Sequence, residues 1–399
     1  MTTEFLFADE MDLSDQRVLL RLDINVPIKD GQVSDNTRIR RIMPGLKALV
    51  AARAKIIILT HFGRPYGKIV PNLSVQPVAD CMAKLLGKPV IVEKDVIGIG
   101  GAQAVAALQS GEVLMMENLR FYPEEEANDL GFAKKLAALG DVYVGDAFSC
   151  AHRAHASIDA LPRLMPAAAG RSFAAELTAL HAALAVPRRP VGAVVGGAKV
   201  SSKLSILENL VTKVDGLILG GGMANTFLLA QGISVGASLA EPDVMTTART
   251  IMTKADAYGC RMILPTDLVV ATAFAANAPH RVTDGSDIAD DEMILDAGPQ
   301  SVATVKAFLG GCQTIVWNGP MGAFELKPFD AATNAAASAV ARLTQDQQVM
   351  SVAGGGDTMA ALVNAGVHDH FTYVSTAGGA FLEWLEGKIL PGVDALRKR

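Results

Sequence analysis

Short, mainly apolar runs alternate with longer stretches of helical periodicity along the whole chain, and this alternation constrains the fold most. We expect strands at residues 17–22, 55–60, 89–92, 112–116, 141–144, 190–195, 216–219, 261–265, 314–317, 348–353 and 371–375. Between them, apolar residues recur with the period of an amphipathic helix over 38–53, 74–86 and 204–210. Such alternation predicts parallel sheets with right-handed helical crossovers, and hence the α/β fold class.

The chain length predicts two domains, because 399 residues are too many for one compact core. Half of the residues are hydrophobic, which is enough apolar surface for two cores. An alanine-rich piece over 166–180 is predicted to be helical and ends shortly before Pro187-Arg-Arg-Pro190. We expect an N-terminal lobe (1–170), an interdomain helix that acts as a hinge (171–189) and a C-terminal lobe (190–386).

Charge, hydropathy and cysteine usage narrow the class of protein. A net charge of −5 and a pI near 5.8 argue against a nucleic-acid partner. No apolar run is long enough for a membrane helix, and the first residues lack the basic start and apolar core of a signal peptide. The four cysteines form no CxxC pair and indicate reduced thiols. We therefore expect a cytoplasmic protein without a membrane partner.

Basic and polar residues in the first half follow the ends of the expected strands. They lie in the segments Arg21-Leu-Asp23-Ile-Asn25, His61-Phe-Gly-Arg64, Glu117-Asn-Leu-Arg120 and His152-Arg153-Ala-His155. Ligands of open parallel sheets bind beyond the carboxyl ends of the strands, and arginine forks recognise compact anions. A lone histidine or arginine is more often structural or solvated, but each of these histidines stands within three residues of an arginine.

Glycine turns that open helices occur in the second half. They are Gly196-Gly-Ala-Lys199, Gly220-Gly-Gly222, Gly354-Gly-Gly-Asp357-Thr358 and Ser375-Thr-Ala-Gly378-Gly379. Bare N–H groups at a helix N-terminus suit a polyphosphate, although a tight turn capped by Asp357 or Thr358 is the structural alternative. We expect Lys199 and Lys203 to share one helical face, where two like charges favour a phosphate ligand. Neither a P-loop nor a G-x-G-x-x-G motif is present.

Together these segments resemble the phosphoglycerate kinase family, and the resemblance runs essentially from end to end. It is carried also by Asp35-Asn-Thr-Arg38, Val316-Trp-Asn318-Gly-Pro-Met-Gly-Ala-Phe-Glu325 and Leu385-Glu-Gly-Lys-Ile-Leu-Pro-Gly392. The resemblance implies a monomer of two lobes, each a doubly wound parallel β-sheet flanked by helices. It also implies that residues 387–399 return to the first lobe. The implied reaction is reversible phosphoryl transfer between 1,3-bisphosphoglycerate with ADP and 3-phosphoglycerate with ATP, with Mg²⁺ as cofactor.

The resemblance also assigns roles to individual residues. The 3-phosphoglycerate ligand would be bound by Asp23, Asn25, Arg38, His61, Phe62, Gly63, Arg64, Arg120 and Arg153. The nucleotide would be bound by Gly197, Lys199, Lys203, Gly221, Asn318, Glu325, Gly355, Gly356, Asp357 and Thr358, with Asp357 near the metal. Catalytic roles fall to Arg38, Lys199 and Gly378, and lobe closure would precede in-line transfer.

Three positions depart from the family pattern, and two other classes of protein stay open. Gly145 stands where the family usually has Asn, Ser202 where it has Asp, and Ala377 where it has Gly. We expect these changes to alter nucleotide affinity or closure without abolishing activity. A dehydrogenase is disfavoured by the missing dinucleotide motif. A non-catalytic scaffold would be expected to have lost Arg38, Lys199, Lys203 or Asp357, and all are present.

Overall fold

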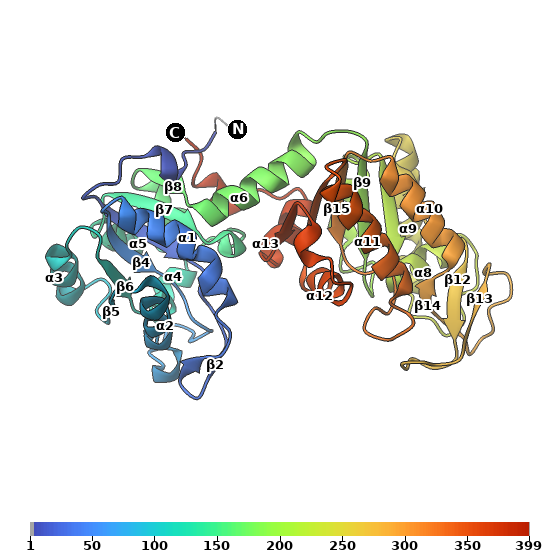
Figure 1. Cartoon of the computed structure of the whole chain (residues 1–399), viewed down its shortest axis with the longest axis horizontal. Helices are drawn as coiled ribbons and strands as arrows, with labels where there is room; N and C mark the ends of the chain where they lie inside the picture. Colours follow the sequence, from blue (N-terminus) through green and yellow to red (C-terminus); the bar gives the residue numbers. More distant parts are fainter. Residues whose placement is uncertain (1–3, 399) are drawn as a thin grey trace. The chain divides into compact units, whose positions relative to one another are not determined.

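The computed structural model describes residues 4–398, which form two compact units (Figure 1). The first unit extends to Thr178 and also includes the segment that starts at Ile389, and the second unit comprises Ala179–Lys388. The boundary falls inside one helix, α6 (Arg171–Leu180). The N-terminal lobe was predicted to begin at residue 1 and the returning segment to end at residue 399. Residues 1–3 and 399 lie outside the described part of the chain.

The first unit is built on a six-stranded parallel sheet in the order β5-β6-β4-β1-β7-β8. Its strands are β1 (Arg17–Leu22), β4 (Lys55–Leu59), β5 (Val90–Glu93), β6 (Val113–Met116), β7 (Val142–Asp146) and β8 (Ala167–Ala169). The other elements are a hairpin, β2 (Ile28–Lys29) and β3 (Gln32–Val33), and the helices α1 (Thr37–Ala51), α2 (Gln76–Leu86), α3 (Ile99–Ala107), α4 (Pro123–Glu126), α5 (Leu130–Ala137) and α14 (Pro391–Asp394).

The second unit repeats this plan with the strand order β11-β10-β9-β15-β16-β17. The strands are β9 (Val191–Gly196), β10 (Gly216–Gly220), β11 (Arg261–Ile263), β15 (Thr314–Asn318), β16 (Met350–Gly354) and β17 (Tyr373–Ser375). Its helices are α7 (Leu204–Leu210), α8 (Gly221–Ala230), α9 (Met245–Ala257), α10 (Pro299–Gly310), α11 (Ala331–Gln345), α12 (Gly356–Asn364) and α13 (Gly379–Leu385). The two doubly wound parallel sheets confirm the predicted α/β class.

Burial explains why these segments form strands and helices. The β1 strand is buried over its last five residues, as expected for a central parallel strand covered on both faces. In α1 the buried residues Ile39, Ile42, Met43, Leu46 and Leu49 recur at helical spacing and pack in the same core cluster. The predicted run 204–210 coincides with α7, and the run 17–22 coincides with β1.

Two parts of the fold differ from the sequence prediction. The alanines expected to open a helix at 167 instead form the edge strand β8, which pairs with β7. The helix α6 begins only after Gly170, where the Asp146 carboxylate accepts a hydrogen bond from the Phe173 amide at 2.8 Å. A second, antiparallel sheet of β13 (His280–Thr283), β12 (Leu268–Ala271) and β14 (Met293–Ala297) was not anticipated.

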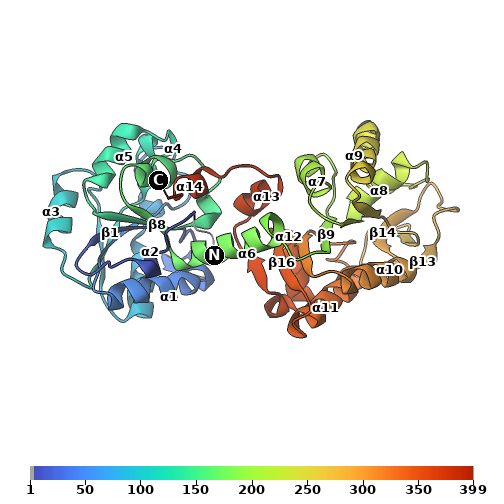
Figure 2. The ribbon, with the colours of Figure 1, turned by 90° about the horizontal axis from the view of Figure 1, so that it is seen from above.

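The segment from Ile389 completes the first unit. Helix α14 contacts the short turns η4 (Phe148–Cys150) and η5 (Ala156–Ala160), and Figure 2 shows it, in dark red, among elements of the first unit. The Gly392 amide donates to the Ala151 carbonyl at 2.8 Å, and Leu396 is 2% exposed. No helix within residues 4–398 combines the length and the apolar character needed to cross a bilayer.

Candidate functional site

The carboxyl ends of four strands in the first unit bring its candidate residues to one edge of the sheet. Asp23 follows β1, His61 follows β4, Arg120 lies in the turn after β6, and Arg153 follows the turn after β7. Parallel strands end at the same edge, so the sheet order itself gathers these side chains.

Hydrogen bonds connect several of these loops. Arg38 Nη1 lies 3.1 Å from Asp23 Oδ2 and donates to the Asn25 carbonyl at 3.2 Å. The Gly63 amide donates to Asn25 Oδ1 at 3.2 Å, and Arg120 Nη1 donates to the Gly63 carbonyl at 2.8 Å. The guanidinium of Arg38 is nevertheless about half exposed, so it remains accessible to a ligand.

Asn118 is a structural residue of this edge that the sequence prediction missed. It is fully buried, accepts from the Phe62 amide at 3.0 Å and donates to the Phe62 carbonyl at 2.7 Å. Its Nδ2 also donates to the Leu73 carbonyl at 2.9 Å. These two hydrogen bonds to the Phe62 backbone fix the loop that carries His61 and Gly63. The only signal was its place in the Glu117-Asn-Leu-Arg120 motif.

Two imidazoles at this edge are surrounded by positive charge. Burial, followed by Arg21 and Arg120, holds the pKa of His61 well below its usual value. Burial, Arg120, Arg21 and Arg153 lower the pKa of His155 to about 4. Both rings are therefore neutral near pH 7. The main counter-charges are Asp23, paired with Arg38, Glu126, 3.2 Å from Arg120 Nε, and the buried Glu125, which interacts with Arg21 and Arg120. This cationic edge favours an anionic ligand.

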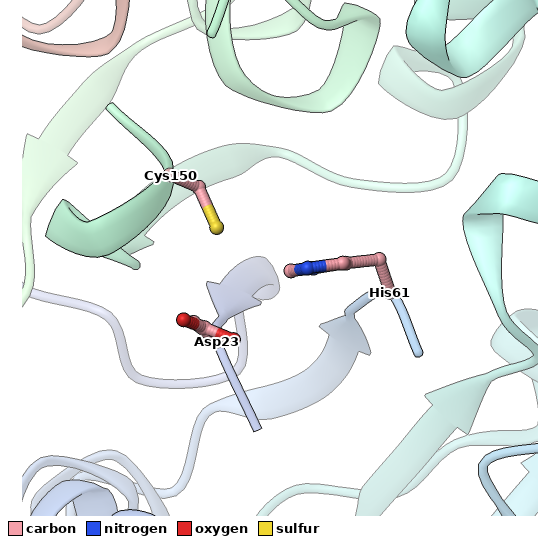
Figure 3. A group of neighbouring side chains, drawn as sticks. All are labelled: Asp23, His61 and Cys150. Atoms are coloured by element: carbon pink, nitrogen blue, oxygen red, sulfur yellow. The ribbon is translucent and has the colours of Figure 1, made fainter. Parts of the chain in front are cut away.

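Asp23, His61 and Cys150 place three potential metal-ligand atoms within 4.8 Å of one another (Figure 3). Burial and the nearby Asp23 raise the pKa of Cys150 to about 11, so the thiol keeps its proton. Arg38 already pairs with Asp23, and Arg21 contacts His61. The charge of the surroundings therefore favours an anion over a divalent cation at this position.

The depressed pKa of His155 predicts how stability depends on pH. Between pH 6.5 and about 4 the unfolded chain binds a proton on this ring and the folded protein does not. The free energy of unfolding should therefore fall as pH falls through this window. Urea unfolding at pH 7.5 and 5.0 should show a larger loss for the wild type than for His155→Gln. Equal losses would show that His155 does not titrate in this way.

In the second unit the candidate nucleotide residues gather where the strand order reverses, between β9 and β15. The ends of these strands approach so closely that only glycine fits. A Cβ at Gly196 would lie 1.7 Å from the Pro320 carbonyl oxygen, and a Cβ at Gly319 would lie 2.1 Å from the Gly196 oxygen. Gly319 also has a φ of +106°.

A cavity of about 270 Å³ opens beside the ends of β9 and β15. It brings together Gly197, Gly221, Glu325 and Asp357 of the predicted residues. Its remaining wall is largely apolar and includes Leu239, Leu268, Phe274, Met293, Leu295 and Phe324. An apolar chamber with a few carboxylates and glycine turns at its rim suits a flat ring system joined to a polar tail.

The two lysines Lys199 and Lys203 do not lie on a common helix, contrary to the sequence prediction. Helix α7 begins at Leu204, so the expectation that both lysines share a helical face is wrong. The Lys203 ammonium is partly buried and donates to Gly196 O and Asn318 Oδ1, both at 2.6 Å, and this burial lowers its pKa to about 8. Lys199 lies exposed in the preceding turn. Gly197, which follows β9 with a φ of +142°, bends the chain before a helix can start.

The turn after β16 presents Asp357 and buries Thr358. Thr358 Oγ1 donates to the Gly354 carbonyl at 2.8 Å and accepts from the Gly319 amide at 2.7 Å. Asn318 Nδ2 donates to the same Gly354 carbonyl at 2.7 Å, so both side chains join the ends of β15 and β16. The Asp357 carboxylate is exposed at the start of α12, and within residues 4–398 it has no hydrogen-bond or ion-pair partner.

Gly355 and Gly378 cap the starts of α12 and α13 in backbone conformations that L side chains rarely adopt, with φ of +104° and +52°. Gly356 is the first residue of α12 and is exposed. The amides at these two helix starts are therefore not shielded by a side chain at either cap.

The three departures from the family pattern have different surroundings. A Cβ at Gly145 would lie 3.1 Å from Leu396 Cδ1, so the returning segment fills the place that a larger residue would take. Ser202 Oγ donates to the Lys199 carbonyl at 2.7 Å and thereby closes the lysine turn. Ala377 is buried one residue before Gly378.

The two α/β units, one with a cationic sheet edge and one with glycine turns around a cavity, define a kinase. A family model described as phosphoglycerate kinase matches residues 8–388. The chain belongs to the phosphoglycerate kinase family, whose members are transferases of class EC 2.7.2.3.

Relatives and solved structures agree with this placement. The chain is 56% identical over 389 residues to the phosphoglycerate kinase of Ruegeria sp. (strain TM1040), covering 98% of each. It is 54% identical over 397 residues to that of Rhodopseudomonas palustris, covering 100% of each. The structure of phosphoglycerate kinase from Coxiella burnetii superposes with a TM-score of 0.93 at 41% identity, covering 98% of both chains. The enzyme from Pyrococcus horikoshii OT3 gives a TM-score of 0.77 at 30% identity and the same coverage.

Proposed function

We propose that this enzyme catalyses reversible, Mg²⁺-dependent phosphoryl transfer between 1,3-bisphosphoglycerate with ADP and 3-phosphoglycerate with ATP. The observation that carries this proposal is the cationic edge of the first unit, where Arg21, Arg120 and Arg153 surround two neutral imidazoles. Buried and half-buried guanidinium groups that outnumber the nearby carboxylates gain most from a ligand with several anionic oxygens. A phosphorylated acid has this chemistry.

The glycerate ligand is bound at this edge by residues of the segments that follow β1, β4, β6 and β7 and by Arg38 in the first turn of α1. They are Asp23, Asn25, Arg38, His61, Phe62, Gly63, Arg64, Arg120 and Arg153. The nucleotide is bound in the second unit, with its base in the apolar cavity and Glu325 on the ribose hydroxyls. Gly197, Lys199, Lys203, Gly221, Asn318, Gly355, Gly356, Asp357 and Thr358 serve the remaining parts of the nucleotide.

The residues present fit a magnesium ion. Asp357 offers exposed carboxylate oxygens with no hydrogen-bond or ion-pair partner among the described residues, only a longer-range attraction to Lys203, and Mg²⁺ prefers oxygen ligands. When bound with the nucleotide, the ion would neutralise phosphate charge. Asp357 would hold it beside the helix start at Gly356.

Catalysis needs no general base, because the attacking carboxylate or phosphate oxygen is already ionised near pH 7. The protein therefore contributes alignment and stabilisation of charge on the transferred group. We assign this role to Arg38 from the first unit, to Lys199 from the second, and to the amides at the helix start beside Gly378. Lys203 donates to two carbonyl groups, one at the end of β9 and one at the end of β15. It is therefore better placed to hold these strand ends together than to move with the phosphoryl group.

The two ligands belong to different units, yet reacting atoms must come within about 3–3.5 Å. We therefore propose that the units close on each other before transfer, with 171–189 and the segment after Lys388 as hinges. Closure would also exclude water from the acyl phosphate. Small-angle scattering should show a smaller radius of gyration with both ligands than with either one. An unchanged radius would count against closure.

Asp357→Asn is expected to raise the Mg²⁺ concentration for half-maximal activity by about tenfold, because one anionic ligand is lost. The KM for 3-phosphoglycerate should change little, since that ligand binds the other unit. Asp346→Asn, an exposed change in the same unit, is the matched control. If both variants keep the wild-type Mg²⁺ dependence, Asp357 is not the metal ligand.

The decisive experiment is a coupled assay of the wild type with 3-phosphoglycerate, ATP and Mg²⁺. Sustained turnover supports the proposed reaction. Binding of both ligands without turnover would instead favour a non-catalytic scaffold, and Ser202 and Ala377 would be examined first. We further propose that the enzyme works as a monomer in the cytoplasm, which fits its four unpaired cysteines.

A further inference from the structure

One ring nitrogen of His61 faces a guanidinium group. Arg21 Nη2 lies 3.2 Å from His61 Nδ1, and the two residues are only 1% and 5% exposed. A guanidinium has five N–H donors and no acceptor. The nitrogen of His61 that meets it must therefore present its lone pair, because a hydrogen on Nδ1 would oppose a hydrogen of Arg21.

Arg21 is held in this orientation by buried partners, one on its own strand β1 and one on the turn η5. Its Nε donates to Ser157 Oγ at 2.8 Å, and its Nη1 donates to the Leu22 carbonyl. Ser157 in turn donates from Oγ to Glu125 Oε1 at 2.5 Å and from its amide to Glu125 Oε2 at 2.9 Å. Ser157 lies in the π-helical turn η5, and Glu125 is fully buried. The guanidinium therefore cannot easily rotate away from His61.

The position of the lone pair fixes the position of the hydrogen. A neutral imidazole that accepts at Nδ1 carries its hydrogen on Nε2. The ring of His61 points toward the space between Asp23 and Cys150 (Figure 3). A metal ion on Nε2 would have to move this hydrogen to Nδ1, against Arg21, so the same contact disfavours metal binding by the three residues.

We propose that Arg21 is a positioning residue that holds His61 in the Nε2–H tautomer, so that a neutral ring donates a hydrogen bond to the anionic ligand. Neutral His61 then acts as a donor without adding a charge to an edge that already carries Arg21, Arg38, Arg64, Arg120 and Arg153. Only the identity of the ligand rests on the proposed function. The tautomer is a property of the ligand-free protein.

The tautomer can be read directly by two-bond ¹H–¹⁵N correlation NMR of ligand-free protein labelled in histidine at pH 7.5. His280 is an internal reference, because its Nδ1 lies 3.0 Å from the Ala278 carbonyl, which can only accept. The two residues should therefore show opposite patterns in one spectrum, with a protonated Nε2 in His61 and a protonated Nδ1 in His280. The variants His61→Gln and His280→Gln assign the signals. A protonated Nδ1 in His61 would overturn the proposal.

Arg21→Met tests the cause. Without the guanidinium, the Nδ1–H tautomer of His61 should become detectable, while the His280 signals stay unchanged. If this variant does not fold, Ser157→Ala removes the Nε anchor of Arg21 and should shift the His61 tautomer in the same direction. A His61 pattern identical to the wild type in a folded variant would show that Arg21 does not set the tautomer.

Two replacements of His61 itself test whether its Nε2 hydrogen is donated to the anionic ligand. Glutamine places an amide nitrogen near the Nε2 position, and asparagine places one near Nδ1. The KM for 3-phosphoglycerate should be about tenfold higher in His61→Asn than in His61→Gln. Equal KM values would contradict the role of the Nε2 hydrogen. The NMR result does not depend on turnover, so failure of the proposed reaction and failure of this inference are distinguishable.

Discussion

Replacing Arg38 by alanine is expected to lower kcat by about 10³–10⁵-fold, the range for an arginine that stabilises a transferred phosphoryl group. This corresponds to about 4–7 kcal/mol of lost transition-state stabilisation. Arg38 is placed for this role because it lies in the first turn of α1, is about half exposed, and is oriented by Asp23, which follows β1, and by the Asn25 carbonyl. The coupled assay with saturating 3-phosphoglycerate, ATP and Mg²⁺ measures the effect.

Arg40→Ala is the matched control for this variant. Arg40 lies on the same helix, is exposed and donates to Asn36 at 2.9 Å, so its loss removes a charge without touching the proposed site. Thermal unfolding should be similar for both variants, because a surface ion pair such as Arg38–Asp23 contributes at most about 1 kcal/mol. Turnover that survives in Arg38→Ala would leave the family unchanged and remove Arg38 from the mechanism.

Among glycine-to-alanine substitutions in the second unit, Gly196→Ala is expected to reduce the stability of that unit most. The added Cβ would lie 1.7 Å from a backbone carbonyl oxygen of Pro320, and neither strand end can move without breaking the contacts of Lys203 and Asn318. We expect a loss of about 3 kcal/mol or more in the free energy of unfolding of this unit. The melting temperature of its transition should fall by about 6–12 °C.

Gly310→Ala controls for the general effect of adding a methyl group. Gly310 ends α10 in open space, without a positive φ, so alanine should be neutral or slightly stabilising there. Calorimetry of the two variants resolves the difference, and ATP binding should be lost in Gly196→Ala alone. Equal melting temperatures would mean that the ends of β9 and β15 can move apart to accommodate the methyl group more readily than their backbone contacts indicate.

The strands could be predicted well where burial on both faces leaves a continuous apolar run. The runs at 17–22 and 55–60 correspond to β1 and β4, and those at 216–219 and 314–317 to β10 and β15. The three-stranded antiparallel sheet escaped detection in part because β13 is short, with polar residues in three of its four positions and only Thr283 buried. Such a strand carries neither an apolar run nor a clear alternation.

The alanines at 167–169 show a different limit of prediction. Alanine has the highest helix propensity, and the segment leads into a true helix. The free edge of β7 and the carboxylate of Asp146 decide the outcome, since the first pairs with the alanines and the second caps the helix after them. The residues that pair with the alanines lie 24 positions earlier in the chain, and Asp146 lies 27 before Phe173, outside the reach of a local pattern.

For the site, the sequence indicated which residues to consider but not how they contact one another. Local motifs identified Asp23, His61 and Arg120, and the sheet order accounts for their common edge. The buried supports Asn118, Ser157 and Glu125 have no motif that separates them from ordinary polar residues, because their role depends on contacts across the fold. The sequence also proposed Lys203, but the hydrogen bonds of its ammonium group to Gly196 O and Asn318 Oδ1 could not be foreseen.

The return of the segment after Lys388 to the first unit has a consequence for biosynthesis. A ribosome completes all the residues of the second unit before it makes Val393 and Leu396, which are buried in the first. Until then the nascent first unit leaves Gly145 and the turns around Ala151 uncovered. The first domain to emerge is thus the last to acquire its final layer, and during elongation its apolar surface is available to chaperones.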